Sequence, residues 1–126
     1  LVKYELPKLR KEMLMGLLFY GSSERPIRIP DRVLAHVKVV IATKLRRGES
    51  FTMSWRHPEG EEGGRSTIWI QPSIPLRFVF GAVEPEMLDP ALLQSYANSA
   101  NSSSGLTIDL DAAVPADAGE SARRTA

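Results

Sequence analysis

The stretch DRVLAHVKVVIATKLRRGESFTMSWR, residues 31–56, joins a helical pattern to a strand pattern. In its first part apolar residues recur every three or four positions and form one face of a helix, namely Val33, Leu34, Val37, Val40, Ile41 and Leu45. Asp31 is a good N-cap, and Gly48, which follows two arginines, is a good stop signal. From Phe51 to Arg56 apolar and polar side chains alternate, which is the period of a strand. We therefore predict a helix followed directly by a strand with one apolar face.

Shorter patterned runs flank this stretch. Before it we predict two strands, Leu17–Tyr20 and Ile27–Ile29, which the turn sequence GSSERP joins. Those after it are two strands, a shorter helix with Asp89 as N-cap and Pro90 in the first helical position, and a last strand: Ser66–Gln71, Leu76–Phe80, Asp89–Ala100 and Leu106–Leu110. The order is ββαβββαβ. Short hairpin links then favour an α+β fold in which two helices cover one face of a mostly antiparallel sheet.

The chain divides into three parts. Its 126 residues are 43% hydrophobic and 25% charged, which is an ordinary composition for one globular domain. We assign an N-terminal extension to residues 1–14, a single α+β domain to residues 15–111 and a disordered tail to residues 112–126, which lack apolar periodicity. The basic and then apolar run before Gly21 imitates a signal peptide. No small-residue cleavage site follows it, and its apolar part is too short to span a membrane.

Charge and cysteine content exclude several classes of function. Lys and Arg total 16 and Asp and Glu total 15, so the net charge of +1 gives no overall attraction to nucleic acid. The chain has no cysteine, which excludes disulfides, thiolate nucleophiles and cysteine-based zinc or iron–sulfur sites. A domain of this size buries a core without disulfides, so we expect a cytoplasmic protein.

The candidate binding residues are outward-facing side chains of the predicted sheet, extended by two arginines at the end of the first helix: Arg28, Arg56, Trp69, Arg77, Arg46 and Arg47. Our leading hypothesis is that this face binds a protein or forms a homo-oligomer, because an exposed aromatic residue on an open sheet marks an interface. The alternative is a nucleic-acid-binding accessory domain. In that case the indole stacks on bases of a single strand and the arginines bind phosphates.

The sequence has no pattern typical of a catalytic, metal or cofactor site. The loop EGEEGGR lacks the lysine and Ser/Thr of a P-loop and leads into a strand instead of a helix. His57 with the glutamates of the same loop makes a poor metal site, and His36 has no partner that the sequence places nearby. There is no G-x-S-x-G turn. We expect no metal, no cofactor and no enzymatic activity; a small enzyme built around Lys44 or His57 is the third alternative.

Lys44 is a charged residue within the apolar face of the first helix, roughly 20° from Val37 at about 100° per residue. One interpretation is a buried lysine that acts as a base or a nucleophile. The interpretation we favour is that its stem covers the core while its ammonium reaches solvent, because the residue lies in the last turn.

The segment from Asp31 to Phe80 resembles a family of short uncharacterised proteins from actinobacteria. Its members share LAHVKVVI.AKLRRGESF, an S-W-x-H hairpin with GRSTIWI.PSIPL, and AN before a final G-L; the counterparts here are Leu34–Phe51, Ser54–His57, Gly64–Leu76 and Ala97–Leu106. Such sequences often carry the label ATP-dependent DNA ligase. A ligase needs a K-x-D-G motif, and the nearest stretch, Lys44–Gly48, has no aspartate. The resemblance therefore implies no ligase activity, and an association with ligases would add only by analogy to the nucleic-acid alternative.

Overall fold

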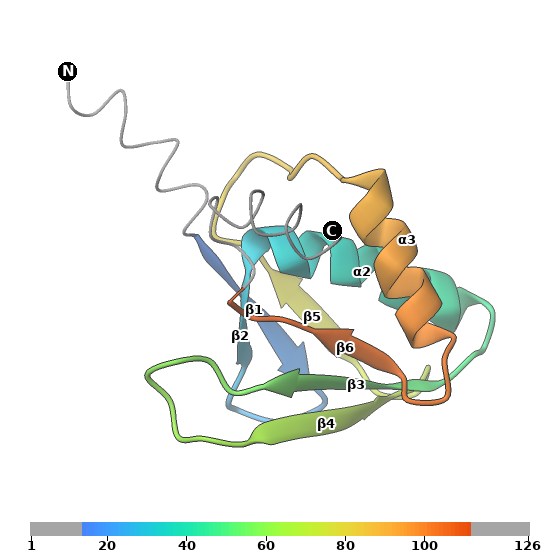
Figure 1. The fold of residues 1–126 in the computed structure, drawn as a ribbon, viewed down its shortest axis with the longest axis horizontal. Helices are drawn as coiled ribbons and strands as arrows, with labels where there is room; N and C mark the ends of the chain where they lie inside the picture. The colour runs from blue at the N-terminus through green and yellow to red at the C-terminus, as the bar shows by residue number, and fades with distance from the viewer. Residues whose placement is uncertain (1–13, 112–126) are drawn as a thin grey trace, which may run out of the picture.

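The structure, a computed structural model, describes residues 14–111 (Figure 1). Its elements in chain order are β1 (Met15–Tyr20), β2 (Ile27–Pro30), α2 (Asp31–Arg46), β3 (Phe51–Arg56), β4 (Arg65–Ile70), β5 (Leu76–Val79), α3 (Pro90–Ala100) and β6 (Leu106–Ile108). They confirm the α+β class and the predicted order ββαβββαβ. The predicted disordered tail, and the predicted N-terminal extension apart from Leu14, lie outside the described residues.

The strands form two three-stranded sheets. β1 is the central strand of the first sheet, with order β2-β1-β5, and both neighbours are antiparallel to it. β3 is the central strand of the second sheet, with order β4-β3-β6, in which β4 is antiparallel and β6 is parallel to β3. The Tyr20 hydroxyl at the end of β1 donates a hydrogen bond to the Trp69 carbonyl of β4 and so connects the sheets. Figure 1 shows the second sheet in front of the first, with the helices above.

The chain changes sheets between β4 and β5. Pro72 and Pro75 lie in this connection, and proline has no N–H with which to continue a ladder. The Gly21 N–H in the β1–β2 turn donates to the Pro75 carbonyl at 2.9 Å, which fixes the connection beside the first hairpin. β5 therefore pairs with β1, with Phe78 opposite Leu18. The pairing is mostly antiparallel, as predicted, but the strands divide between two sheets instead of one.

One core lies between the inner faces of both sheets and the helices. Its most buried members, each at most 2% exposed, are Leu18, Ile29, Val33, Leu34, Val37, Ile41, Met53, Ile70 and Leu106. This list contains four residues of the predicted apolar face of the first helix. Of the other two, Val40 is 5% exposed and Leu45 is partly buried against the core, so the predicted face is confirmed. Gly16 allows α2 to approach the first sheet, because a Cβ there would lie 2.6 Å from the Leu34 Cδ2 and 2.8 Å from the Val79 carbonyl oxygen.

Three of the predicted helix-end residues hold their expected positions. Asp89 is the N-cap of α3, where its carboxylate accepts a hydrogen bond from the Ala91 N–H at 3.0 Å, and Pro90 is the first helical residue. α2 ends at Arg46, and Gly48 two residues later has φ 72°, the left-handed conformation that favours glycine.

The prediction of Asp31 as N-cap is wrong. Asp31 is the first residue of α2, and its buried carboxylate accepts hydrogen bonds from the Gly81 and Ala82 N–H groups, both at 2.9 Å. The acid therefore fixes the chain that follows β5 to the start of α2, and it still lies in the first turn, where a negative charge is favourable.

Candidate functional site

The predicted binding residues do not share one surface. They fall into three groups: Arg28 and Arg77 on the outer face of the first sheet, Arg56 and Trp69 on the outer face of the second, and Arg46 and Arg47 at the C-terminal end of α2. All are exposed. The prediction of one basic face around the indole is therefore wrong, because β5 pairs with β1 and carries its arginine to the first sheet.

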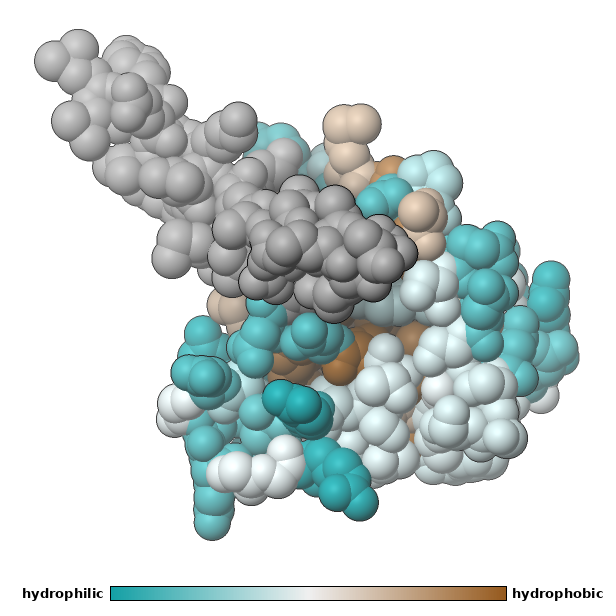
Figure 2. All heavy atoms as spheres, in the orientation of Figure 1, coloured by the Kyte–Doolittle hydropathy of each residue, from teal (hydrophilic) through white to brown (hydrophobic). Residues whose placement is uncertain are grey.

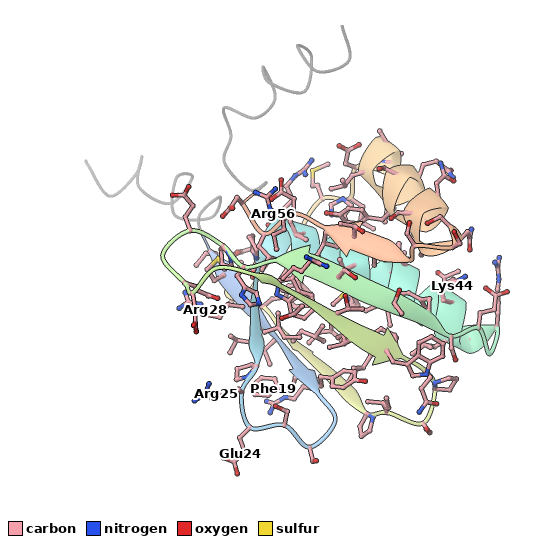
Figure 3. All side chains as sticks on the ribbon, turned by 60° about the horizontal axis from the view of Figure 1, so that its bottom comes forward. Phe19, Glu24, Arg25, Arg28, Lys44 and Arg56 are labelled. Atoms are coloured by element: carbon pink, nitrogen blue, oxygen red, sulfur yellow. The ribbon has the colours of Figure 1, made fainter. Side chains whose placement is uncertain are left out.

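The outer face of the first sheet combines apolar side chains with arginines. Leu17 lies between Arg28 of β2 and Val79 of β5, and Phe19 lies opposite Arg77. The Arg77 guanidinium carbon lies 5.6 Å from the centroid of the Phe19 ring, within cation–π distance. We call these five residues the arginine–apolar face. Figure 3 shows Phe19 and Arg28 on the two strands of the first hairpin.

Within residues 14–111, neither α2 nor α3 covers the arginine–apolar face. α2 packs on the opposite side of the first sheet, where Gly16 makes room for Leu34, and α3 contacts α2, β3 and β6. The apolar members of the face are half-buried and its arginines are exposed. A solvated sheet face normally carries polar side chains, so apolar residues on the outer side of a central strand distinguish this surface.

The outer face of the second sheet is mostly polar. At its centre the Ser54 Oγ and Thr67 Oγ1 atoms are 2.7 Å apart. Trp69 lies at one end with 52% of its surface exposed. At the other end Arg56 lies directly opposite Arg65, a pairing of like charges that is unfavourable in a sheet.

Carboxylates surround the arginine end of the second sheet. Arg56 lines a hollow of about 280 Å³ together with Asp109 and Asp111. The loop that follows β3 adds three glutamates. The three strands of the first sheet carry no carboxylate, and Glu24 lies in the turn between two of them. Arg28 in turn lines a hollow of about 260 Å³ together with Glu61 of the β3–β4 loop, so a carboxylate lies near an arginine of each outer face.

Lys44 connects the C-terminal ends of both helices. Its Nζ donates a hydrogen bond to the Asn101 Oδ1 at 2.8 Å and lies 3.1 Å from the Glu49 Oε1, and its side chain is only 12% exposed. Asn101 is the C-cap of α3. In the favoured interpretation the ammonium extends freely into solvent, and the structure does not show this. Its two partners give the ammonium a structural role.

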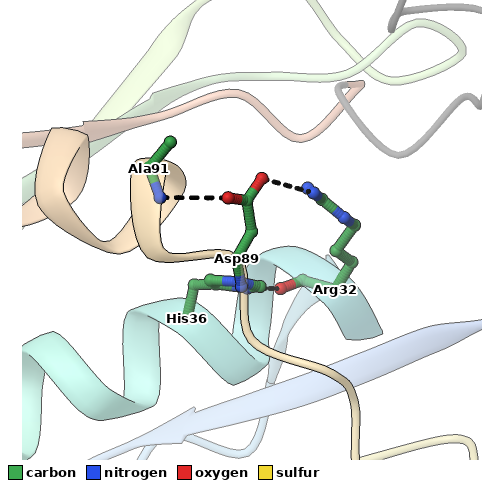
Figure 4. A network of polar contacts seen from close by, with 4 residues as sticks. All are labelled: Arg32, His36, Asp89 and Ala91. Atoms are coloured by element: carbon green, nitrogen blue, oxygen red, sulfur yellow. Dashed lines mark hydrogen bonds and ion pairs between the residues drawn. The ribbon is translucent and has the colours of Figure 1, made fainter.

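A second polar network holds the start of α3 against α2 (Figure 4). The fully buried His36 lies with Nδ1 2.6 Å from the Arg32 carbonyl oxygen, and its Nε2 accepts the Asp89 N–H at 2.8 Å. These partners require a proton on Nδ1 and none on Nε2. The Asp89 carboxylate also pairs with Arg32 at 3.1 Å. The hydrogen bond from the Ala91 N–H holds the pKa of Asp89 below its ordinary value, and the Leu92 N–H and the Arg32 guanidinium contribute smaller effects in the same direction. Burial has the opposite effect on this pKa.

His57 fixes the loop between β3 and β4. Its Nε2 lies 2.8 Å from the Ser66 Oγ, and its Nδ1 lies 3.0 Å from the Glu62 carbonyl oxygen. Both contacts are typical of a structural histidine. Within residues 14–111 no group of three or more His, Asp or Glu side chains could hold a metal ion.

The connection from β5 to α3 exposes apolar side chains that sequence reasoning missed. Val83 is 96% exposed, Met87 87% and Leu88 45%. We call residues 81–88 the exposed loop. It borders a hollow of about 360 Å³ whose other wall is α2. Figure 2 shows tan and brown spheres at the upper edge of the molecule, where Figure 1 has this loop. Its apolar residues have no regular period, so no pattern indicates them.

Comparison with protein families gives one match. A family model described as a domain of unknown function (DUF7882) matches residues 15–111. The chain belongs to the DUF7882 family. The matched span contains all the helices and strands described above. No curated protein and no solved structure matches this DUF7882 chain. In the described part of the domain, neither helix has the length and apolar character needed to cross a membrane.

Proposed function

We propose that this DUF7882 domain is a non-enzymatic, cytoplasmic protein-binding module that self-associates through the arginine–apolar face. The observation that carries the proposal is the outward direction of Leu17 and Phe19 on a sheet face that, within the described residues, neither α2 nor α3 covers. Aliphatic and aromatic side chains gain free energy when such a face is buried, at about 25 cal/mol per Å² of apolar area.

The composition of this face suits a protein partner. Aromatic residues and arginine are enriched in protein interfaces, and they supply many of the side chains that dominate binding energy. Arg77 already lies against the Phe19 ring, so its guanidinium is partly ordered before a partner arrives. An ordered side chain loses less conformational entropy on binding.

Nucleic acid binding is the alternative, and the exposed ring of Trp69 favours it. Base stacking needs aromatic faces, and a backbone track needs uncompensated positive charge. On the second sheet Arg56 shares a hollow with Asp109 and Asp111, and the loop that follows β3 carries three glutamates. On the first sheet, two of the three apolar members are aliphatic. Both faces are therefore better suited to protein than to a single strand.

The size of the face sets an expected affinity. The three strands have six, four and four residues. At about 3.3 Å per residue and about 4.8 Å between strands they cover roughly 220 Å². A standard interface buries about 800 Å² on each partner. The sheet face alone would therefore give a weak dimer, with a Kd in the micromolar range or above, unless neighbouring segments extend the contact.

Sedimentation velocity over a concentration series tests the proposal. We expect the parent to form a dimer, and we expect Phe19→Ser and the double variant Arg28→Glu/Arg77→Glu to shift it toward monomer. Arg56→Glu is the matched control, because it reverses an exposed arginine on the other sheet, and it should leave the dimer unchanged. Circular dichroism checks that each variant is folded. A parent that stays monomeric at several hundred micromolar would refute the proposal, and loss of the dimer only in Arg56→Glu would move the interface to the second sheet.

A further inference from the structure

Polar contacts hold α2 and α3 together in two places, and a hollow lies between these contacts. Near the start of both helices, Asp89 contacts Arg32 and His36. At the C-terminal ends of the helices, Lys44 donates a hydrogen bond to Asn101. Between these contacts the two helices border a hollow of about 350 Å³. It shares no residue with the arginine–apolar face, so it is a separate surface from the proposed dimer interface.

The walls of this hollow are apolar. Both helices contribute to them, with the side chains of Val39, Val40, Pro90, Leu93 and Ala97. Three of these residues are only half-buried, so an apolar ligand would remove further apolar surface from water. The volume is near the lower limit of ligand pockets, about 300 Å³. At about 30 Å³ for a group the size of water, the hollow accommodates roughly ten to twelve heavy atoms.

One positively charged side chain in the hollow has no carboxylate partner. Four of the five polar residues that line it already form a side-chain hydrogen bond within the domain, namely Thr43, Lys44, Gln94 and Asn101. The fifth is Arg47, whose guanidinium forms no ion pair within residues 14–111. In the described part of the chain, no carboxylate lines the hollow. Arg47 is therefore available to an anionic group of a ligand.

The charge balance at this end of the helices favours an anion. Lys44, Arg46 and Arg47 are positive, and Glu49, which pairs with Lys44, is negative. The C-terminal end of each helix adds a partial charge of about −0.5, which leaves roughly one net positive charge. A guanidinium presents its N–H groups in a planar fork that matches the two oxygens of a carboxylate.

We propose that the hollow between α2 and α3 binds a small amphipathic carboxylate, of which a short aliphatic acid is the simplest example. The apolar chain of the ligand lies against Val39, Leu93 and Ala97, and its carboxylate accepts hydrogen bonds from the Arg47 guanidinium. Because the hollow is open to solvent on one side, binding is weak, with a Kd on the order of 1 mM for a ligand of this size.

Titration of the full chain with sodium octanoate, followed by ¹H–¹⁵N NMR, tests this site. We expect saturable shifts of the amide signals of Val39, Leu93 and Ala97. Arg47→Gln should weaken octanoate binding at least about fivefold, because the variant loses the charged donor. Arg46→Gln is the matched control. It removes a positive charge from the same end of α2 without lining the hollow, so it should change the Kd by less than about twofold.

A second variant and a second ligand test the shape of the hollow and the charge of the ligand separately. Ala97→Leu fills the hollow with apolar atoms and leaves every charge in place, so a folded Ala97→Leu chain should not bind octanoate; circular dichroism checks its fold. Octan-1-ol has the same chain without the negative charge and should bind the parent at least about fivefold more weakly than octanoate.

Four results would overturn the proposal. They are a parent without saturable shifts, shifts located away from both helices, equal weakening in the two arginine variants, and octanoate binding that survives in a folded Ala97→Leu chain. Equal weakening would mean that octanoate follows only the general positive charge of this helix end. An equal affinity for octan-1-ol and octanoate would show that the ligand class is wrong, since Arg47 would then not recognise the carboxylate.

Discussion

Replacing Lys44 with methionine tests whether its ammonium is part of the packing between the two helices. Methionine keeps most of the stem of the side chain and removes the charge. In the native protein the ammonium donates to the Asn101 Oδ1 at 2.8 Å and pairs with the Glu49 Oε1 at 3.1 Å. The substitution therefore separates the contribution of these polar contacts from that of the apolar stem.

The expected loss follows from the exposure of the two partners. A hydrogen bond from a charged donor contributes about 1.5–3 kcal/mol. The pair with Glu49 adds about 0–1 kcal/mol, because the Glu49 side chain is 45% exposed and solvent screens it. Methionine removes the cost of desolvating the ammonium and so offsets part of this sum. We expect Lys44→Met to lower the free energy of unfolding by about 1–3 kcal/mol.

Urea denaturation followed by the fluorescence of the buried Trp55 measures this change. A double-mutant cycle with Asn101→Ala should give a coupling of about 1–2 kcal/mol. Lys38→Met is the control, because Lys38 is exposed on the same helix and its replacement should change stability by less than about 0.5 kcal/mol. A neutral or stabilising Lys44→Met would mean that the ammonium is effectively solvated, and the structural role assigned to it would be wrong.

Three further predictions follow from positions described by the structure or by the sequence pattern. Gly105→Ala should lower the free energy of unfolding by more than about 3 kcal/mol, because φ is 80° and a Cβ would lie 2.0 Å from the Thr52 Oγ1. Gly48→Ala is the control: a Cβ there meets nothing within 4 Å, so the loss should be about 1 kcal/mol in the same urea titration. Burial raises the pKa of Tyr96 to about 12; the charge of Arg32 opposes this rise and the charge of Asp109 adds to it. The neutral phenol thus contributes stability that is complete below about pH 10 and is lost as the pH rises toward 12, so Tyr96→Phe should flatten this part of the stability profile. Deleting residues 112–126 should leave the thermal midpoint almost unchanged, because the segment has no apolar periodicity, and a drop of several degrees would contradict the predicted domain boundary.

The elements that the sequence predicts best are those whose period is long or whose end residues are specific. The apolar residues of α2 recur over four turns, and Asp89 followed by Pro90 marks the start of α3. The alternation in β3 correctly indicates one apolar face, on which Phe51 and Met53 are buried. Each of these inferences needs only neighbouring residues.

The partner of β5 could not be predicted, and the error in the candidate site follows from it. The pattern of Leu76–Val79 gives the faces of the strand but not the strand with which it pairs. That choice depends on the prolines before it and on the hydrogen bond between Gly21 and Pro75, which join distant parts of the chain. The N-cap prediction for Asp31 is wrong for a similar reason, since its hydrogen-bond partners, Gly81 and Ala82, are 50 residues or more away.

The parallel pairing of β6 with β3 has a consequence for synthesis on the ribosome. The first sheet has all its strands once Val79 has left the exit tunnel, but Met53 and Trp55 wait for Leu106 and Ile108, their partners in the register. Until then β3 is an unpaired edge on one side, and such edges associate with other chains. Nascent or truncated chains that stop before Gly105 should therefore hold a formed first sheet and an open, aggregation-prone second one. β6, the last strand to be synthesised, is thus the strand that covers the open edge of β3.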